Sequence, residues 1–167
     1  MSVENEQLKR FIEETGLLME AGGLPRTAGL VLGFMLVCEP EQQSMTDMTT
    51  ALGISKATAS AMTRMLMHIG FLERSVGPVD RRDYYRISPK AWERFFRTRI
   101  ETMHRLSTAA EHGLHILRHA SPERRERLER MRGLSSFLER ELGGLLAQFE
   151  AEEKERTARR TAEAVTP

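Results

Sequence analysis

The chain has 167 residues, 40% hydrophobic and 29% charged, a composition typical of a soluble globular protein. It has no apolar run long enough for a membrane span, no signal-peptide core at its polar N-terminus and a single cysteine, so we expect a cytoplasmic protein without an internal disulfide. The net charge is +1, but residues 44–100 carry ten Lys or Arg against five Asp or Glu, which mildly favours nucleic-acid contact in this central part.

Two helices are predicted in the first quarter of the chain. Apolar residues recur at helical spacing over about residues 6–19, and Gly22 and Gly23 end that helix. Pro25 suits the first turn of a second helix, whose sequence is LPRTAGLVLGFMLVC, and Pro40 ends it. This second helix is apolar on almost all sides, so we expect it to be the buried centre of its domain.

The next segment predicts two short helices and a hairpin. Ser44 and Asp47 have the spacing that starts a helix, which we expect to end near Leu52. Ser55 is a good N-cap for a helix over residues 56–69. The β-compatible stretches FLERS and DYYRIS then flank VGPVDRR, a turn rich in Gly, Pro and Asp. Two helices joined by a short turn predict a helix-turn-helix, and the hairpin predicts a wing beside it.

Two long helices are predicted in the remainder. Ser88–Pro89 opens a helix that we expect to run to about Ala120, and Ser121–Pro122 opens the last helix. An apolar stripe with one polar position, Ser135, follows a heptad spacing along this last helix. Its apolar members are Leu128, Met131, Leu138, Leu142, Leu145 and Phe149. The stripe needs a partner, which is the preceding helix, a second subunit or both.

The predicted fold is mainly α with a small β-hairpin wing. We expect an N-terminal helix for dimerisation over residues 1–22, a winged helix-turn-helix over 23–88, a long helical hairpin for dimerisation over 89–155, and a polar, disordered tail over 156–167.

The two sides of the helix over residues 56–69 differ in chemistry. Ala59, Met62, Leu66 and Ile69 fall on one face, which we expect to pack. The opposite side is small, polar or basic, and no acidic residue lies between Gly53 and Phe71. Small residues let a helix approach base edges, and Ser, Thr and Arg donate hydrogen bonds to phosphates or bases. The predicted DNA-contacting residues are Ser55, Lys56, Ala57, Thr58, Ser60, Thr63 and Arg64 on this helix, with Arg81 and Arg82 on the wing.

These motifs resemble those of MarR-type winged helix-turn-helix transcriptional regulators, most closely the GbsR-like branch. Ile54-Ser55-Lys56 with Thr58 and Ser60 resembles the start of the family's recognition helix. Gly70-Phe71-Leu72 with Arg74 resembles the entry to its wing, and Asp80-Arg81-Arg82 its wing signature. The pair Tyr84-Tyr85 and the helix GLPRTAGLVLGFML are similar to the GbsR-like branch.

The resemblance implies a homodimer that binds a roughly palindromic operator in double-stranded DNA with two recognition helices. It further implies a repressor that a small-molecule effector releases. The alternative is a winged-helix adaptor that binds proteins and not DNA.

Other candidate sites are weaker. Cys38 could sense oxidants, but a free cysteine on an apolar helix is usually a core residue. His112, His115 and His119 could share a metal, although no Cys or Asp cluster joins them, and we predict no metal site. An adaptable effector pocket could be lined by methionines, namely Met19, Met35, Met62, Met65, Met67 and Met103. No phosphate-binding glycine loop or catalytic motif is present, so we expect no enzyme and no cofactor.

Overall fold

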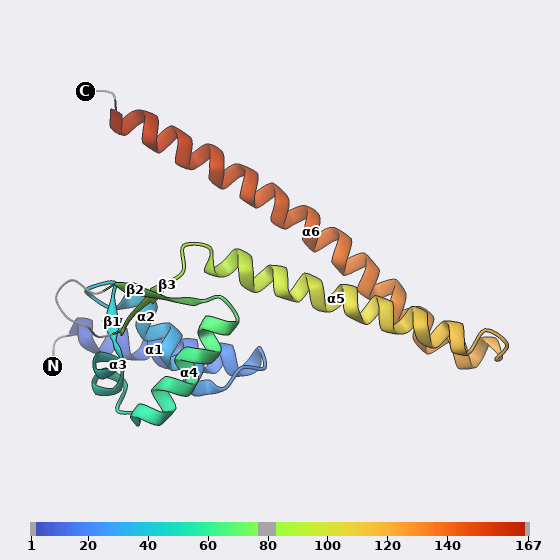
Figure 1. The fold of residues 1–167 in the computed structure, drawn as a ribbon, viewed down its shortest axis with the longest axis horizontal. Coiled ribbons are helices and arrows are strands. Elements are labelled where there is room, and N and C mark those ends of the chain that lie inside the picture. Colours follow the sequence, from blue (N-terminus) through green and yellow to red (C-terminus); the bar gives the residue numbers. More distant parts are fainter. Residues whose placement is uncertain (1–2, 77–82, 166–167) are drawn as a thin grey trace. The chain divides into compact units, whose positions relative to one another are not determined.

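The structure, a computed structural model, describes residues 3–76 and 83–165 and divides the chain into two units (Figure 1). The first unit is Met1–Arg94 and the second is Phe95–Pro167. As the sequence predicted, the fold is mainly helical with one small antiparallel sheet.

The first unit is built around helix α2. Helix α1 (Val3–Ala21) packs along α2 (Arg26–Val37), and the side chains of Val31 and Leu32 on α2 are fully buried. A Cβ atom at Gly29 would lie only 2.7 Å from the Cα of Gly16, so the two helix backbones approach at a pair of glycines. The apolar character of α2 on most sides is therefore explained by its central position.

The sheet has the expected hairpin and one strand that the sequence did not predict. Strands β2 (Leu72–Val76) and β3 (Asp83–Ile87) form the antiparallel hairpin, with Leu72 opposite Ile87. Strand β1 (Gln43–Ser44) pairs with the other edge of β3, so the sheet order is β1-β3-β2. A two-residue strand has too few positions to show an alternating pattern in the sequence.

The second unit is a helical hairpin. Helix α5 (Ala91–Ile116) begins two residues after Pro89, and α6 (Pro122–Val165) begins at the expected Ser-Pro pair. Helix α6 continues through residues 156–165, so the prediction of a disordered tail over 156–167 is wrong as far as Val165. Ala, Glu and Arg favour helix, and Glu153 pairs with Arg156 one turn away, so this segment remains helical without an apolar stripe.

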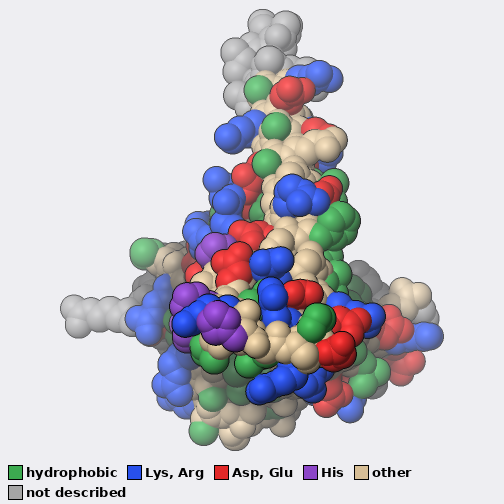
Figure 2. Space-filling model, turned by 90° about the vertical axis from the view of Figure 1, so that its right-hand side faces the viewer, with side chains coloured by type: hydrophobic (Ala, Val, Ile, Leu, Met, Phe, Trp, Pro, Cys, Tyr) green, Lys and Arg blue, Asp and Glu red, His purple; other side chains and the backbone are tan. Residues whose placement is uncertain are grey.

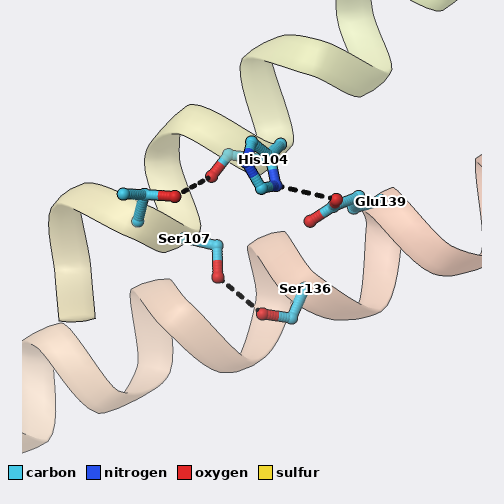
Figure 3. Close-up of polar contacts among 5 residues, drawn as sticks. His104, Ser107, Ser136 and Glu139 are labelled. Atoms are coloured by element: carbon cyan, nitrogen blue, oxygen red, sulfur yellow. Dashed lines mark hydrogen bonds and ion pairs between the residues drawn. The ribbon is translucent and has the colours of Figure 1, made fainter.

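A polar seam joins α5 to α6 in the middle of the hairpin (Figure 3). The hydroxyl of Ser107 lies 2.7 Å from that of Ser136, and His104 Nδ1 lies 2.9 Å from Glu139 Oε1. We call these four residues the polar seam. Toward the hairpin's turn the contact becomes apolar, with Ala110 and Leu114 of α5 buried.

Candidate nucleic-acid interface

Helices α3 (Met45–Leu52) and α4 (Lys56–His68) form the helix-turn-helix. Helix α3 begins with a reciprocal cap: the Asp47 amide donates to Ser44 Oγ at 3.3 Å, and the Ser44 amide donates to Asp47 Oδ2 at 2.8 Å. It ends at Gly53, whose φ of +63° is a left-handed conformation that glycine adopts without steric cost. This turn leads directly into the cap of α4.

Ser55 fixes the start of α4. Its Oγ accepts a hydrogen bond from the Thr58 amide at 3.1 Å, and it lies 2.8 Å from Thr58 Oγ1. The expected N-cap is therefore present, and it engages the hydroxyls of Ser55 and Thr58, two of the residues that we predicted to contact DNA. Both hydroxyls retain acceptor lone pairs, and one of the two hydrogens is free to donate to a phosphate oxygen.

The outward side of α4 carries the positive charges of Lys56 and Arg64. The side chains of Lys56, Ala57, Arg64 and His68 are exposed, and those of Thr58 and Ser60 are half-buried. Among the described residues, Arg64 takes part in no ion pair, so its guanidinium is available to a base edge or a phosphate. The helix N-terminus adds the partial positive charge of its free amides. This side therefore suits a polyanion.

The prediction that Thr63 contacts DNA is wrong. Its side chain is 1% exposed, and its Oγ1 donates to Met48 Sδ on α3 at 3.8 Å. The face of α4 that packs is centred on Ala59, Thr63 and Leu66, and Met62 and Ile69 are only half-buried. Thr63 thus joins the two helices of the motif instead of facing outward.

The strands of the wing are nearly neutral in charge. Arg86 lies opposite Glu73 in the hairpin and pairs with it, with Nη2 2.8 Å from Oε1. Arg74 lies 3.8 Å from Asp83 in a looser ion pair. The sequence showed these arginines but not their partners, because pairing across a hairpin depends on its register. Arg81 and Arg82 lie outside the described residues.

Cys38 lies in a protected position at the C-terminal end of α2. Its side chain is half-buried, and Sγ lies 3.6 Å from the carbonyl oxygen of Met35. Burial raises the pKa of the Cys38 thiol, which lowers the fraction of reactive thiolate at neutral pH. This environment favours a structural role over redox sensing.

The three histidines near the hairpin turn do not form a metal cluster. Helix α5 ends at Ile116, so His119 lies beyond it, and its Nε2 accepts a hydrogen bond from Arg118 Nε at 3.1 Å. Within residues 3–76 and 83–165, no three His, Cys, Asp or Glu side chains are placed to hold a metal ion. Figure 2 shows histidine side chains lying among basic and acidic side chains on the face that it presents.

Met19 and Met35 fill the core of the first unit. Their side chains are at most 9% exposed, and Met48, which we had not singled out, is fully buried beneath the helix-turn-helix. Met103 belongs to the second unit. A methionine-lined effector pocket stays a prediction.

In the part of the chain that the structure describes, no helix is both long enough and apolar enough to cross a bilayer.

Comparison with known proteins identifies the family. The family model described as "MmpR5-like MarR family transcriptional regulator" matches residues 90–152, and the IclR helix-turn-helix domain matches residues 35–75. The HTH-type transcriptional regulator MmpR5 of Mycobacterium tuberculosis (strain ATCC 25618 / H37Rv) is 39% identical over 142 residues, covering 85% of this chain and 86% of the relative.

A solved structure agrees with this assignment. The crystal structure described only as that of a transcriptional regulator is 38% identical, with a TM-score of 0.76, and the match covers 87% of this chain and 99% of the other. Together with a capped helix-turn-helix, a hairpin wing and an outward helix face without acidic residues, these matches show that the chain belongs to the MarR family and is a DNA-binding transcriptional regulator.

Proposed function

We propose that this protein is a homodimeric repressor that inserts α4 into the major groove of a roughly palindromic operator. The observation that carries the proposal is the outward side of α4, with exposed Lys56, Ala57 and Arg64 and no acidic residue between Gly53 and Phe71. Two copies related by a two-fold axis would present two such helices to grooves about one helical turn apart.

The contacts divide into two classes. Ser55, Lys56 and Thr58 lie at the N-terminal end of α4 and would bind phosphates, together with Arg81 and Arg82 of the wing. Ala57, Ser60 and Arg64 would approach base edges, with Arg64 as the strongest base-reading candidate because arginine binds guanine in a bidentate manner.

An exposed apolar surface on α6 supports dimerisation. Four large side chains on this helix are 46–62% exposed, and we call them the apolar α6 surface: Leu134, Phe137, Leu145 and Phe149. Such side chains, gathered on one helix, are typical of protein-protein contacts. Leu145 and Phe149 belong to the heptad stripe of the sequence, and Leu134 and Phe137 widen this stripe on one side.

The remaining parts of the proposal rest on the family and the sequence. An effector that prefers a dimer with a different spacing between its two α4 helices would release the operator. We infer a cytoplasmic location from this role in transcription, and we assign the protein no catalytic activity. Tyr84-Tyr85 and the sequence of α2 support a GbsR-like relationship within the family.

Substitution of Arg64 tests the recognition role of α4. Operator fragments would first be selected from genomic DNA with the wild-type protein, and binding would then be measured by fluorescence anisotropy at fixed salt. We expect Arg64→Ala to weaken binding to the selected operator by about 1–3 kcal/mol per half-site and to relax the preference at one base position.

Arg10→Ala is the matched control. Arg10 is exposed on α1 and pairs with Glu14, so this change removes the same charge from a surface away from α4 and the wing. Because α1 is also a predicted dimerisation helix, light scattering would verify that this variant keeps the mass of the wild-type protein. If both variants bind the operator as tightly as wild type, α4 does not read the DNA as proposed. If the wild-type protein selects no DNA at any salt concentration, the adaptor alternative is supported instead.

A further inference from the structure

Two adjacent glycines, Gly143 and Gly144, lie near the middle of the continuous helix α6. At both Gly143 and Gly144, an added Cβ atom would meet nothing within 4 Å. The packing of the described chain therefore does not require glycine at either position. Glycine is among the least favourable residues in a helix interior, because the helix restricts its large backbone freedom. A pair of glycines in open space makes this the point where α6 bends most easily.

Helix α6 is firmly attached to α5 on the N-terminal side of these glycines. A Cβ at Gly113 of α5 would lie 2.7 Å from Leu128 Cδ1, so the two helices are in close contact there. The polar seam adds a hydrogen bond between the hydroxyls of Ser107 and Ser136 and one between His104 Nδ1 and Glu139 Oε1, as Figure 3 shows. Ser135, beside the seam, is 5% exposed. We call residues 122–142 the clamped part of α6.

On the other side of the glycines, the attachment is weaker. Arg97 of α5 pairs with Glu150, but the Arg97 side chain is 64% exposed, and an ion pair in water holds two helices weakly. Leu145 and Phe149 have large exposed fractions. Ion pairs within the helix, Glu153 with Arg156 and Glu155 with Arg159, favour its helical state without attaching it to α5. We call residues 145–165 the arm.

We propose that Gly143 and Gly144 form a hinge about which the arm changes direction relative to the clamped part of α6. The hinge separates a segment attached by apolar and polar contacts from a segment that is helical by its own composition. Because Leu145 and Phe149 lie on the arm and Leu134 and Phe137 lie on the clamped part, bending changes the shape of the apolar α6 surface. The inference concerns one chain and depends on neither DNA binding nor dimerisation.

Distances between spin labels test the hinge in the full-length protein. Ala109 on α5 and Ala151 on the arm are both exposed, so Ala109→Cys and Ala151→Cys, with Cys38→Ser, accept labels without loss of packing. Pulsed electron resonance would be recorded with excess unlabelled protein, so that distances between subunits do not contribute. We expect a broad distribution of distances between the two labels. The double substitution Gly143→Ala with Gly144→Ala should reduce the width of this distribution at least about twofold.

The clamped part supplies the controls. A label pair at Ala109→Cys and Arg132→Cys should give a narrow distribution that the alanine changes leave unaltered. Gly133→Ala, also in open space but on the clamped part, should not narrow the Ala109–Ala151 distribution. An Ala109–Ala151 distribution already as narrow as the control pair in the wild-type background would overturn the hinge.

A second measurement separates the hinge from a contact role of the glycines. Light scattering of the Gly143→Ala, Gly144→Ala variant should give the same mass as wild type. Loss of a wild-type dimer in this variant would mean that the glycines allow close approach of a second chain, and the hinge would be rejected. A wild-type monomer would contradict the proposed dimer and leave the label experiment as the test of the hinge.

Discussion

Ser55 and Thr63 both carry hydroxyls in the recognition motif, but their positions give them different functions. The Ser55 hydroxyl caps α4 at an exposed site, where it also faces any ligand of the helix N-terminus. The Thr63 hydroxyl lies inside the motif against Met48. Burial, and not residue type, therefore distinguishes a hydroxyl that joins the two helices from a hydroxyl that is accessible to a ligand.

Two substitutions at Ser55 separate capping from DNA contact. Ser55→Ala removes the acceptor for the Thr58 amide, so we expect a loss of about 1 kcal/mol in the free energy of unfolding and weaker operator binding. Ser55→Asp keeps a capping acceptor and should restore the stability, but its negative charge should weaken operator binding further. Thermal unfolding and anisotropy would measure the two effects. Equal operator affinity for Ser55→Asp and wild type would place the DNA away from this helix end.

Predictions for single residues were reliable where they depend only on neighbours in the sequence. Ser44 with Asp47, and Ser55, were predicted as caps because a cap requires residues within one turn of each other. Thr63 was misplaced because it lies at the edge of the apolar face, where helical periodicity does not decide whether a polar side chain points inward. Only the contact with Met48, fifteen residues away, settles its orientation.

At the scale of elements, the α5–α6 hairpin depends on a close approach at Gly113. Leu128 Cδ1 occupies the space beside this glycine, so a branched side chain there would push α6 away from α5. The sequence indicated both helices through their Ser-Pro starts, but it did not indicate the contact at Gly113. Its steric role, like the polar seam, depends on which residues of the other helix lie opposite.

A substitution series at two glycines tests this contact. We expect Gly113→Val to lower the free energy of unfolding by about 1–3 kcal/mol through overpacking against Leu128. Gly133→Ala, in open space on α6, should instead raise it by up to about 1 kcal/mol through helix propensity. Urea unfolding followed by circular dichroism would compare the variants. A neutral or stabilising Gly113→Val would show that Leu128 moves aside without cost.

At the scale of the whole molecule, the distribution of charge is decided by pairing as well as by composition. Residues 44–100 are basic by count, but Glu73 and Asp83 lie beside two of the arginines on the wing strands. The proposal therefore assigns the positive charge that meets a polyanion to α4 and to Arg81 and Arg82. A sum of charges along the sequence does not reveal this, because it ignores which side chains meet.

The salt dependence of operator affinity tests which basic side chains bind phosphates. Removal of one phosphate-binding side chain should lower the slope of log affinity against log salt concentration by about 0.9, so we expect Arg81→Ala with Arg82→Ala to flatten the slope. The matched control is Glu73→Gln with Arg86→Gln, which removes an ion pair at constant net charge and should leave the slope unchanged. A flatter slope in the control would mean that Arg86 binds phosphates despite its partner.

One residue links the wing to the helix-turn-helix. Ser44 lies opposite Tyr84 in the sheet, and the same residue is the N-cap of α3 through its hydrogen bonds with Asp47. A strand of two residues thus acts as a mechanical coupling: a displacement of β3 pulls on the first turn of α3. We therefore expect a displacement of the wing to shift the first turn of α3, the helix that supports α4.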